Sequence, residues 1–118
     1  MIGLGRIRHV GDATVLELDG DADLAALPAL SQLLAKAVSS ASGPIVVDVD
    51  GLALLDDAAL GLILGAAATA RRQGLELRLL CTGERRRARL ADTRVDRIVD
   101  VVDNLDNLSG LATPDPAD

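Results

Sequence analysis

Hydrophobic and polar residues alternate at the start of the chain and then recur at helical spacing. The alternation predicts two short strands joined by a hairpin turn at Gly11-Asp12, with strand positions at Ile7, His9, Val15, Leu16 and Leu18. Further along, apolar residues at i, i+3, i+4, i+7 and i+8 predict a helix whose stripe is Leu30, Leu33, Leu34, Ala37 and Val38. Pro28 suits the first turn of this helix, and the turn-forming residues 39–44 end it.

The second half of the chain continues as strand, helix, strand and helix. The β-branched run 45–49 is typical of a central strand covered on both faces. Asp56 and Asp57 can cap a second helix, which Gly74 ends. Alternating polarity predicts a strand over 75–81, followed by a helix over 84–92, a short strand over 98–102 and helical turns within 105–111. The fold class is therefore α/β, a mixed β-sheet with an opening β-hairpin and helices packed on the sheet.

Length and composition indicate one globular domain. The chain has 118 residues, 49% of them hydrophobic and 25% charged, which is far from the composition of a disordered protein. We expect a single domain over residues 1–111 and a flexible, proline-broken tail over 112–118. The sequence contains no Phe, Tyr or Trp and has a net charge of −6, so it lacks stacking platforms and repels phosphate backbones. Nucleic acid is not expected as a partner.

The sequence also indicates a cytoplasmic protein. Cys81 is the only cysteine, so no intramolecular disulfide can form. Residues 1–10 do not have the pattern of a signal peptide. The longest uncharged apolar run, 58–70, is shorter than the ~20 residues that cross a bilayer. We expect no direct insertion into a membrane.

No set of residues predicts a catalytic site, and we expect neither an enzyme nor a cofactor. His9 is the only histidine and has no nucleophile and orienting acid in a recognisable motif, so it is expected on the surface or on an edge strand. Cys81 ends an apolar strand and is expected to be a small buried hydrophobe. The residues Gly3-Leu4-Gly5 lack the third glycine and the preceding strand of a dinucleotide-binding motif.

Charged residues form one acidic and one basic group. Two loops could bring together the carboxylates of Asp19, Asp21, Asp23, Asp56 and Asp57. A magnesium site there is conceivable, but loop and capping roles are more frequent for Asp, and we predict no metal. The basic group is Arg85, Arg86, Arg87 and Arg89. It is interpreted either as a solvated helix face or as a contact for a partner with an acidic groove.

Three segments in order resemble the STAS domain family, in particular bacterial anti-sigma-factor antagonists. Residues 20–28 (GDADLAALP) are similar to the family's G-E-L-D-L-A-T-A-P. Residues 46–61 (VVDVDGLALLDDAALG) are similar to V-V-D-L-S-G-V-x-F-L-D-S-S-G-L-G, and the segment 89–101 is similar to L-x-x-T-G-L-D-x-x-F. The resemblance covers about residues 7–108.

The resemblance implies a protein-binding regulator of sigma-factor-dependent transcription. Such proteins bind an anti-sigma factor that is also a serine kinase, and the kinase inactivates them by phosphorylating the second serine of D-S-S-G. That position is Ala58 here, so the chain resembles a non-phosphorylatable variant; Asp57 replaces the first serine and Ala59 the glycine. The docking residues that the resemblance implies are Asp21, Asp23, Asp56, Asp57, Ala58, Ala59, Leu60 and Gly61.

The substitution at Ala58 leaves three interpretations open. Without a hydroxyl the protein can be permanently competent to bind, because a phosphate of about −1.5 to −2 charge can never form at this position. Asp57 can instead place a fixed carboxylate at the helix start and imitate an inactivated form. As a third interpretation, Asp57 only caps the second helix.

Two other function classes are weighed against the anti-sigma-factor antagonist. One is a scaffold or adaptor subunit of a multiprotein signalling or transport complex, a role in which STAS-like domains also occur. The other is a small-molecule sensor or an enzyme, which no group of residues supports. The sequence does not predict the oligomeric state.

Overall fold

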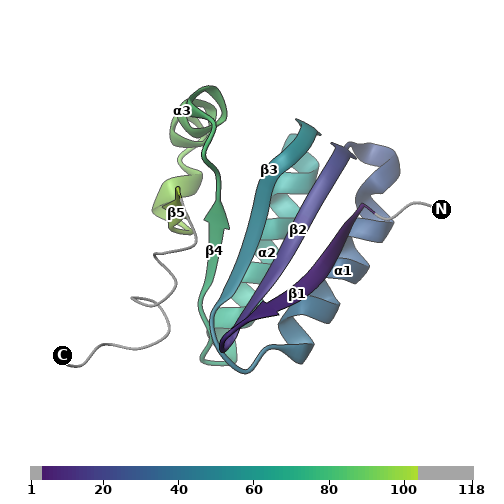
Figure 1. Cartoon of the computed structure of the whole chain (residues 1–118). Helices are drawn as coiled ribbons and strands as arrows, with labels where there is room; N and C mark the ends of the chain where they lie inside the picture. The colour runs from purple at the N-terminus through teal and green to yellow at the C-terminus, as the bar shows by residue number, and fades with distance from the viewer. Residues whose placement is uncertain (1–3, 104–118) are drawn as a thin grey trace.

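The computed structural model describes residues 4–103, which form five strands, three α-helices and two short 3-10 helices (Figure 1). The strands are β1 (Gly5–Val10), β2 (Ala13–Ala22), β3 (Ile45–Leu55), β4 (Leu77–Leu80) and β5 (Val101–Val102). The α-helices are α1 (Leu27–Ser40), α2 (Asp57–Arg72) and α3 (Glu84–Asp92), and the 3-10 helices are η1 (Leu24–Ala26) and η2 (Val95–Arg97).

All five strands belong to one mixed sheet in the order β1-β2-β3-β4-β5. β1 pairs antiparallel with β2, and the other neighbours pair parallel. Gly11 has a φ of 60°, the left-handed region that glycine enters without steric cost, at the turn between β1 and β2. The predicted α/β class, the mixed sheet and the opening hairpin are confirmed.

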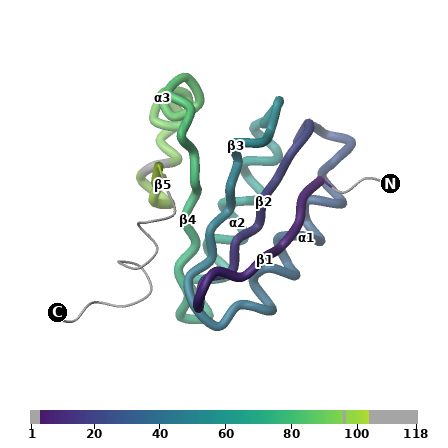
Figure 2. Tube along the Cα trace, in the orientation of Figure 1, coloured from purple at the N-terminus to yellow at the C-terminus, as the bar shows by residue number. Residues whose placement is uncertain are grey.

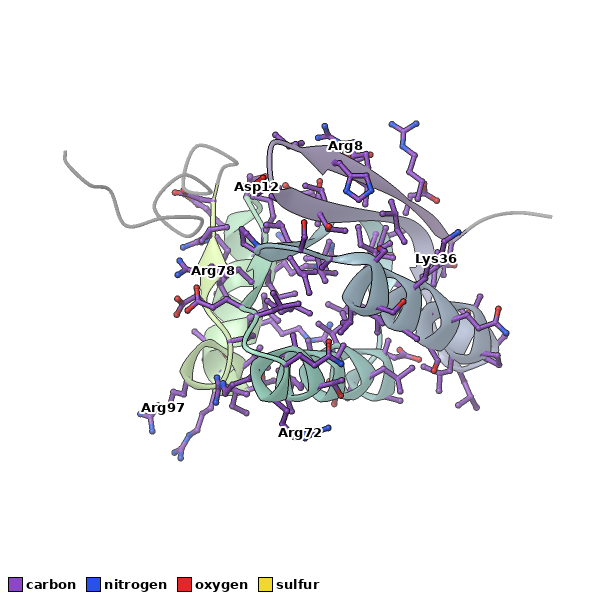
Figure 3. The ribbon with its side chains drawn as sticks, turned by 90° about the horizontal axis from the view of Figure 1, so that it is seen from below. Arg8, Asp12, Lys36, Arg72, Arg78 and Arg97 are labelled. Atoms are coloured by element: carbon purple, nitrogen blue, oxygen red, sulfur yellow. The ribbon has the colours of Figure 1, made fainter. Side chains whose placement is uncertain are left out.

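The helices pack on one face of the sheet, with α1 and α2 on the same side (Figure 3). The core contains Leu, Val, Ile, Ala and Cys81, and α1 contributes Leu30, Leu34, Ala37 and Val38 to it. Leu90 of α3 belongs to the same cluster. The opposite face carries a smaller buried group of Ala13, Val15, Val46, Leu80 and Val102. β3 is central, as predicted, but described helices cover only one of its faces.

The lengths of three strands differ from the sequence-based prediction. β3 continues to Leu55 because Leu52 and Leu55 point into the core and pair with β2. β4 is limited to four residues, and β5 to two because η2 occupies part of the chain between α3 and β5. The prediction for α3 is confirmed at both ends. The helical turns expected within 105–111 and the tail 112–118 lie outside the described residues.

None of the described helices is both long and apolar enough to cross a membrane.

A group of charged residues lies on the sheet face away from α1 and α2. Glu17 accepts hydrogen bonds from Arg6 at 2.9 Å and Arg8 at 2.8 Å, and these bonds lower its pKa. Asp48, the register neighbour of Glu17 on β3, is half-buried, and burial raises its pKa; the nearby carboxylates of Asp50 and Glu17 add to this rise. Asp48 Oδ1 also accepts a hydrogen bond from the Asp50 N–H at 2.9 Å, which partly offsets the rise.

Because their pKa values are shifted in opposite directions, Asp48 and Glu17 are expected to change the pH dependence of stability in opposite ways. A raised pKa means that the folded protein holds the Asp48 proton more tightly than the unfolded chain, so Asp48 opposes folding as the pH rises through its pKa. Asp48→Asn, which keeps an acceptor for the Asp50 N–H, is expected to raise the urea midpoint at pH 7 and to lose this gain as the pH falls through the usual Asp range near ~3.9. Glu17→Gln, the matched control, is expected to lower the midpoint at pH 7 and to have less effect in acid. An equal rise in the urea midpoint of Asp48→Asn at pH 7 and at pH 3 would contradict a raised pKa of Asp48.

Candidate functional site

The candidate site lies at the carboxyl ends of β2 and β3. The two strands pair in parallel to their last residues, where Ala22 is opposite Leu55. The Asp56 N–H donates to the Ala22 carbonyl at 3.0 Å, just beyond the last strand pair. β2 leads into η1 and β3 leads directly into α2, so the starts of these two helices lie at the same edge of the sheet (Figure 2). This edge is where α/β proteins commonly bind their ligands.

The first turn of α2 exposes its first two residues, Asp57 and Ala58. Asp56 occupies the N-cap position but makes no side-chain capping bond, and Asp57 is the first helical residue. The Asp57 side chain is 83% exposed and pairs with Arg89 at 3.0 Å. Ala58 is exposed beside it. The predicted start of α2 at these two aspartates is confirmed, but Asp56 makes no side-chain capping bond and the carboxylate of Asp57 pairs with a guanidinium on α3.

Two predicted docking residues are buried. Ala59 is 0% exposed and Leu60 is 6% exposed, and both belong to the hydrophobic core. Helix geometry explains this, since Ala59 and Leu60 recur with Ile63 and Ala67 at the three- and four-residue spacing of one helix face, and that face packs against the sheet. Ala59 and Leu60 cannot contact a partner directly, whereas Gly61 is exposed.

Asp21 and Asp23 come from the end of β2. Asp21 is exposed and lies opposite Leu54 in the register of β2 and β3. Asp23 is the N-cap of η1, and its Oδ1 accepts a hydrogen bond from the Ala26 N–H at 3.2 Å. Asp21 is thus available to a partner, while Asp23 also has a structural role.

The arginines of α3 attach this helix to the strand ends. Arg86 donates to the Val49 carbonyl at 2.8 Å, Arg87 to the Cys81 carbonyl at 3.0 Å, and Arg89 to the Leu55 carbonyl at 2.9 Å. Neither interpretation from the sequence describes these three side chains, because they bind backbone carbonyls of this chain. Arg85 is exposed and makes no such contact with the described part of the chain.

The attachment follows from unequal strand lengths. β4 pairs with β3 only from Ile45 to Asp48, so β3 extends beyond its neighbour. Thr82, just after β4, donates to Asp50 through its backbone N–H at 2.7 Å and its hydroxyl at 2.8 Å. The carbonyls of Val49 and Leu55 lie in the part of β3 that β4 does not pair, and Arg86 and Arg89 satisfy them. The tube shows α3 beside this end of β3 (Figure 2).

The sequence reasoning missed two leucines at this edge. Leu24 at the start of η1 is 73% exposed, and Leu54 near the end of β3 is 41% exposed. Ala53 and Ala58 are exposed as well. Leu54 and Leu55 are consecutive leucines, so they interrupt the alternation of buried and exposed positions along β3. Two consecutive leucines cannot both point into a core on one face of a strand, and this was the available signal.

The other residues considered for catalysis or metal binding do not form a site within the described residues. His9 is exposed on the edge strand β1, as predicted, and its Nδ1 lies 3.5 Å from the Thr14 hydroxyl. Cys81 is buried, as predicted, and burial raises the pKa of its thiol. Among the described residues, no group of three or more His, Cys, Asp or Glu side chains could hold a metal ion. The aspartates at the strand ends therefore do not converge on one point.

Comparison with known proteins agrees with this geometry. The family model described as "Mlab, STAS domain" matches residues 6–102. The chain belongs to the STAS domain family. The resemblance in the three sequence segments is thereby confirmed at the level of the family. No curated protein matches the chain significantly.

Solved STAS-like structures share the fold of this chain at low sequence identity. An anti-sigma factor antagonist from Mycobacterium paratuberculosis has a TM-score of 0.77 at 18% identity, over 91% of this chain and 92% of its own. A variant of RsbS from Moorella thermoacetica has a TM-score of 0.71 at 21% identity, over 91% and 93% of the two chains. Phosphorylated SpoIIAA from Bacillus has a TM-score of 0.66 at 17% identity, over 90% and 97%. Identities this low establish the fold alone.

The attachment of α3 to this STAS domain can be tested through Arg89. Arg89→Met removes the bond to the Leu55 carbonyl and is expected to lower the free energy of unfolding by about 1 kcal/mol, the usual net value of one hydrogen bond. Asp57→Asn removes only a solvent-exposed ion pair and is expected to cost less than about 0.5 kcal/mol. Urea unfolding of the two single variants and of the double variant measures these losses in the free energy of unfolding. Equal losses for the two single variants would show that the carbonyl contact contributes nothing.

Proposed function

We propose that this STAS domain is a non-catalytic regulator that binds an anti-sigma factor, as the resemblance to anti-sigma-factor antagonists implies. The surface that binds it is the docking face, defined as Asp21, Asp23, Asp56, Asp57, Ala58 and Gly61. The main support is the exposed first turn of α2 at the carboxyl edge of the sheet, with Asp57 and Ala58 open to solvent. Binding at this face influences sigma-factor-dependent transcription by occupying the anti-sigma factor.

The residues at positions 57 and 58 support binding that does not depend on phosphorylation. The family resemblance assigns the phosphorylated serine to position 58, where this chain has a methyl group. Asp57 carries a single negative charge and pairs with Arg89, whereas a phosphoserine carries about −1.5 to −2. The face is therefore closer in charge to an unmodified antagonist than to a phosphorylated one, and it cannot be switched by a kinase at position 58.

The experiment is a binding assay with purified anti-sigma kinases of the source organism, with and without ATP. We expect a complex with one of them, unchanged by ATP, and no phosphate on this chain in intact-mass spectra. The variant Asp57→Ser/Ala58→Ser restores both hydroxyls and is expected to gain one phosphate and to dissociate when ATP is added. Phosphate at the start of α2 in the unmodified protein, or no binding to any anti-sigma factor, contradicts the proposal.

A second candidate function is an adaptor subunit of a larger signalling or transport complex. It is favoured by the family model that matches the chain, whose description names Mlab and no anti-sigma-factor antagonist. A surface without a phosphorylation switch also suits a permanent subunit. Size-exclusion chromatography of the tagged protein from its host distinguishes the two candidates. A large, stable assembly that contains no sigma-pathway protein would favour the adaptor, and a small complex with an anti-sigma factor would exclude it.

A further inference from the structure

We infer that the docking face recognises a partner surface on which an apolar side chain is surrounded by lysines and arginines. This inference rests on the proposed function in placing the contact at the first turn of α2, and it adds the chemistry of the partner. It extends the docking face by Leu24 and Leu54, which the family resemblance does not assign.

The apolar part of the recognition comes from these two leucines. They are two of the four exposed large hydrophobic residues among those described, and they lie at the same edge of the sheet. Leu54 is on β3 next to the end of β2, and Leu24 begins η1 two residues after β2 ends. Ala53, next to Leu54 on β3, and Ala58, in the first turn of α2, are exposed as well. Apolar surface gathered in this way is typical of a protein contact, whereas single exposed leucines are not.

The charged part of the recognition comes from aspartates that form no ion pair within the described part of the chain. Asp21, Asp23 and Asp56 lie at this edge, Asp19 precedes them on β2 opposite Gly51, and within the described residues none of the four forms an ion pair. Asp57 is the exception, because Arg89 pairs with it. The chain as a whole carries a net charge of −6. A partner surface that carries lysines or arginines would complement these carboxylates.

At this edge two exposed leucines lie among several aspartates, whereas Val10 and Ile98 are each the single exposed large hydrophobic residue of their segment among the described residues. Val10 also has one exposed aspartate nearby, Asp12, in the turn after β1. Val10 is on β1 in the same strand as Arg8 and His9, and Ile98 follows Arg97, with its carbonyl accepting a hydrogen bond from Arg71 at 3.3 Å. These two sites have basic neighbours and serve as matched controls for the acidic edge.

The same charge pattern argues against two other classes of partner. Anionic lipid headgroups and nucleic-acid phosphates are both repelled by a rim of carboxylates. A basic, apolar protein surface is attracted by it. The occupant to which the inference commits is therefore a protein segment that presents Leu, Ile, Val, Met or an aromatic residue between lysines or arginines.

The first test is site-specific photo-cross-linking in the native host. A photoreactive phenylalanine analogue replaces Leu54 in one variant and Ile98 in the control, and circular dichroism checks that both fold. We expect a specific protein cross-linked at position 54 and not at 98, and mass spectrometry of the linked peptide should find an apolar residue flanked by Lys or Arg. A linked peptide with an acidic or uncharged surround, cross-links equal at both positions, or none at 54 would overturn the inference.

The second test measures affinity for the protein identified at position 54. Leu24→Ser and Leu54→Ser are each expected to weaken binding by roughly tenfold or more, as truncation of an apolar anchor does. Val10→Ser and Ile98→Ser are expected to change it by less than about twofold, the level of residues outside an interface. Asp21→Lys should also weaken binding relative to the unmodified protein. Raising the salt concentration should weaken the complex of the unmodified protein, because salt screens charge attraction. Affinity that does not respond to salt or to Asp21→Lys contradicts the basic rim.

The identity of the captured protein separates the two proposals. An anti-sigma factor with a basic, apolar contact supports both. A different protein with the same contact chemistry supports this inference and contradicts the proposed function. An anti-sigma factor that binds through an acidic or uncharged surface supports the proposed function and overturns this inference.

Discussion

The parallel pairing of β2 with β3 determines which residues meet at the carboxyl edge of the sheet. It runs from Thr14 opposite Ile45 to Ala22 opposite Leu55, with two register shifts near the end. Because both strands end at the same level, the segments that follow them, η1 and α2, start side by side. The exposed leucines and aspartates of the site belong to these segments or to the last residues of the two strands. A slip of one residue in this pairing would exchange the buried and exposed faces of either strand and remove the site.

β3 is longer than β4, so some of its backbone carbonyls need hydrogen-bond partners that β4 cannot supply. Side chains of α3 supply them. Carbonyl groups near the end of β3 have no strand partner on the β4 side, and unpaired backbone groups are costly wherever they lose contact with water. Arg86 and Arg89 bind the carbonyls of Val49 and Leu55, and Thr82 binds the side chain of Asp50. The basic character of α3 is thus explained by the architecture of the sheet. Arg89 also joins α3 to Asp57, so the two helices that border the edge are directly connected.

Periodicity predicted the elements that depend on local pattern, and it failed where distant segments decide the outcome. The stripe of α1 and both ends of α3 were predictable from residue spacing alone. The length of β3 was not, because the run of residues after 49 becomes a strand only through its pairing with β2. The roles of Asp57 and Arg89 were missed for the same reason, since they are 32 residues apart in sequence and meet only in the fold. The burial of Ala59 and Leu60 could have been predicted from their position on the helix stripe that packs against the sheet.

The pair formed by Asp57 and Arg89 argues against one interpretation of the substitution at Ala58, the one in which Asp57 imitates a phosphate. A carboxylate that imitates phosphate must present uncompensated negative charge to the partner, in the position where the phosphate would be. Asp57 is one residue earlier in the helix, carries one charge, and has a guanidinium 3.0 Å away. Within the described residues, the aspartates at or just before this edge that form no ion pair are Asp19, Asp21, Asp23 and Asp56, all of them outside α2. If the docking face binds as proposed, its electrostatic attraction therefore comes from β2 and its flanks, and α2 contributes shape. A phosphate at position 58 would then disrupt the contact through its bulk and its cost of desolvation in the region that contributes shape, and not by removing the attraction to a basic partner.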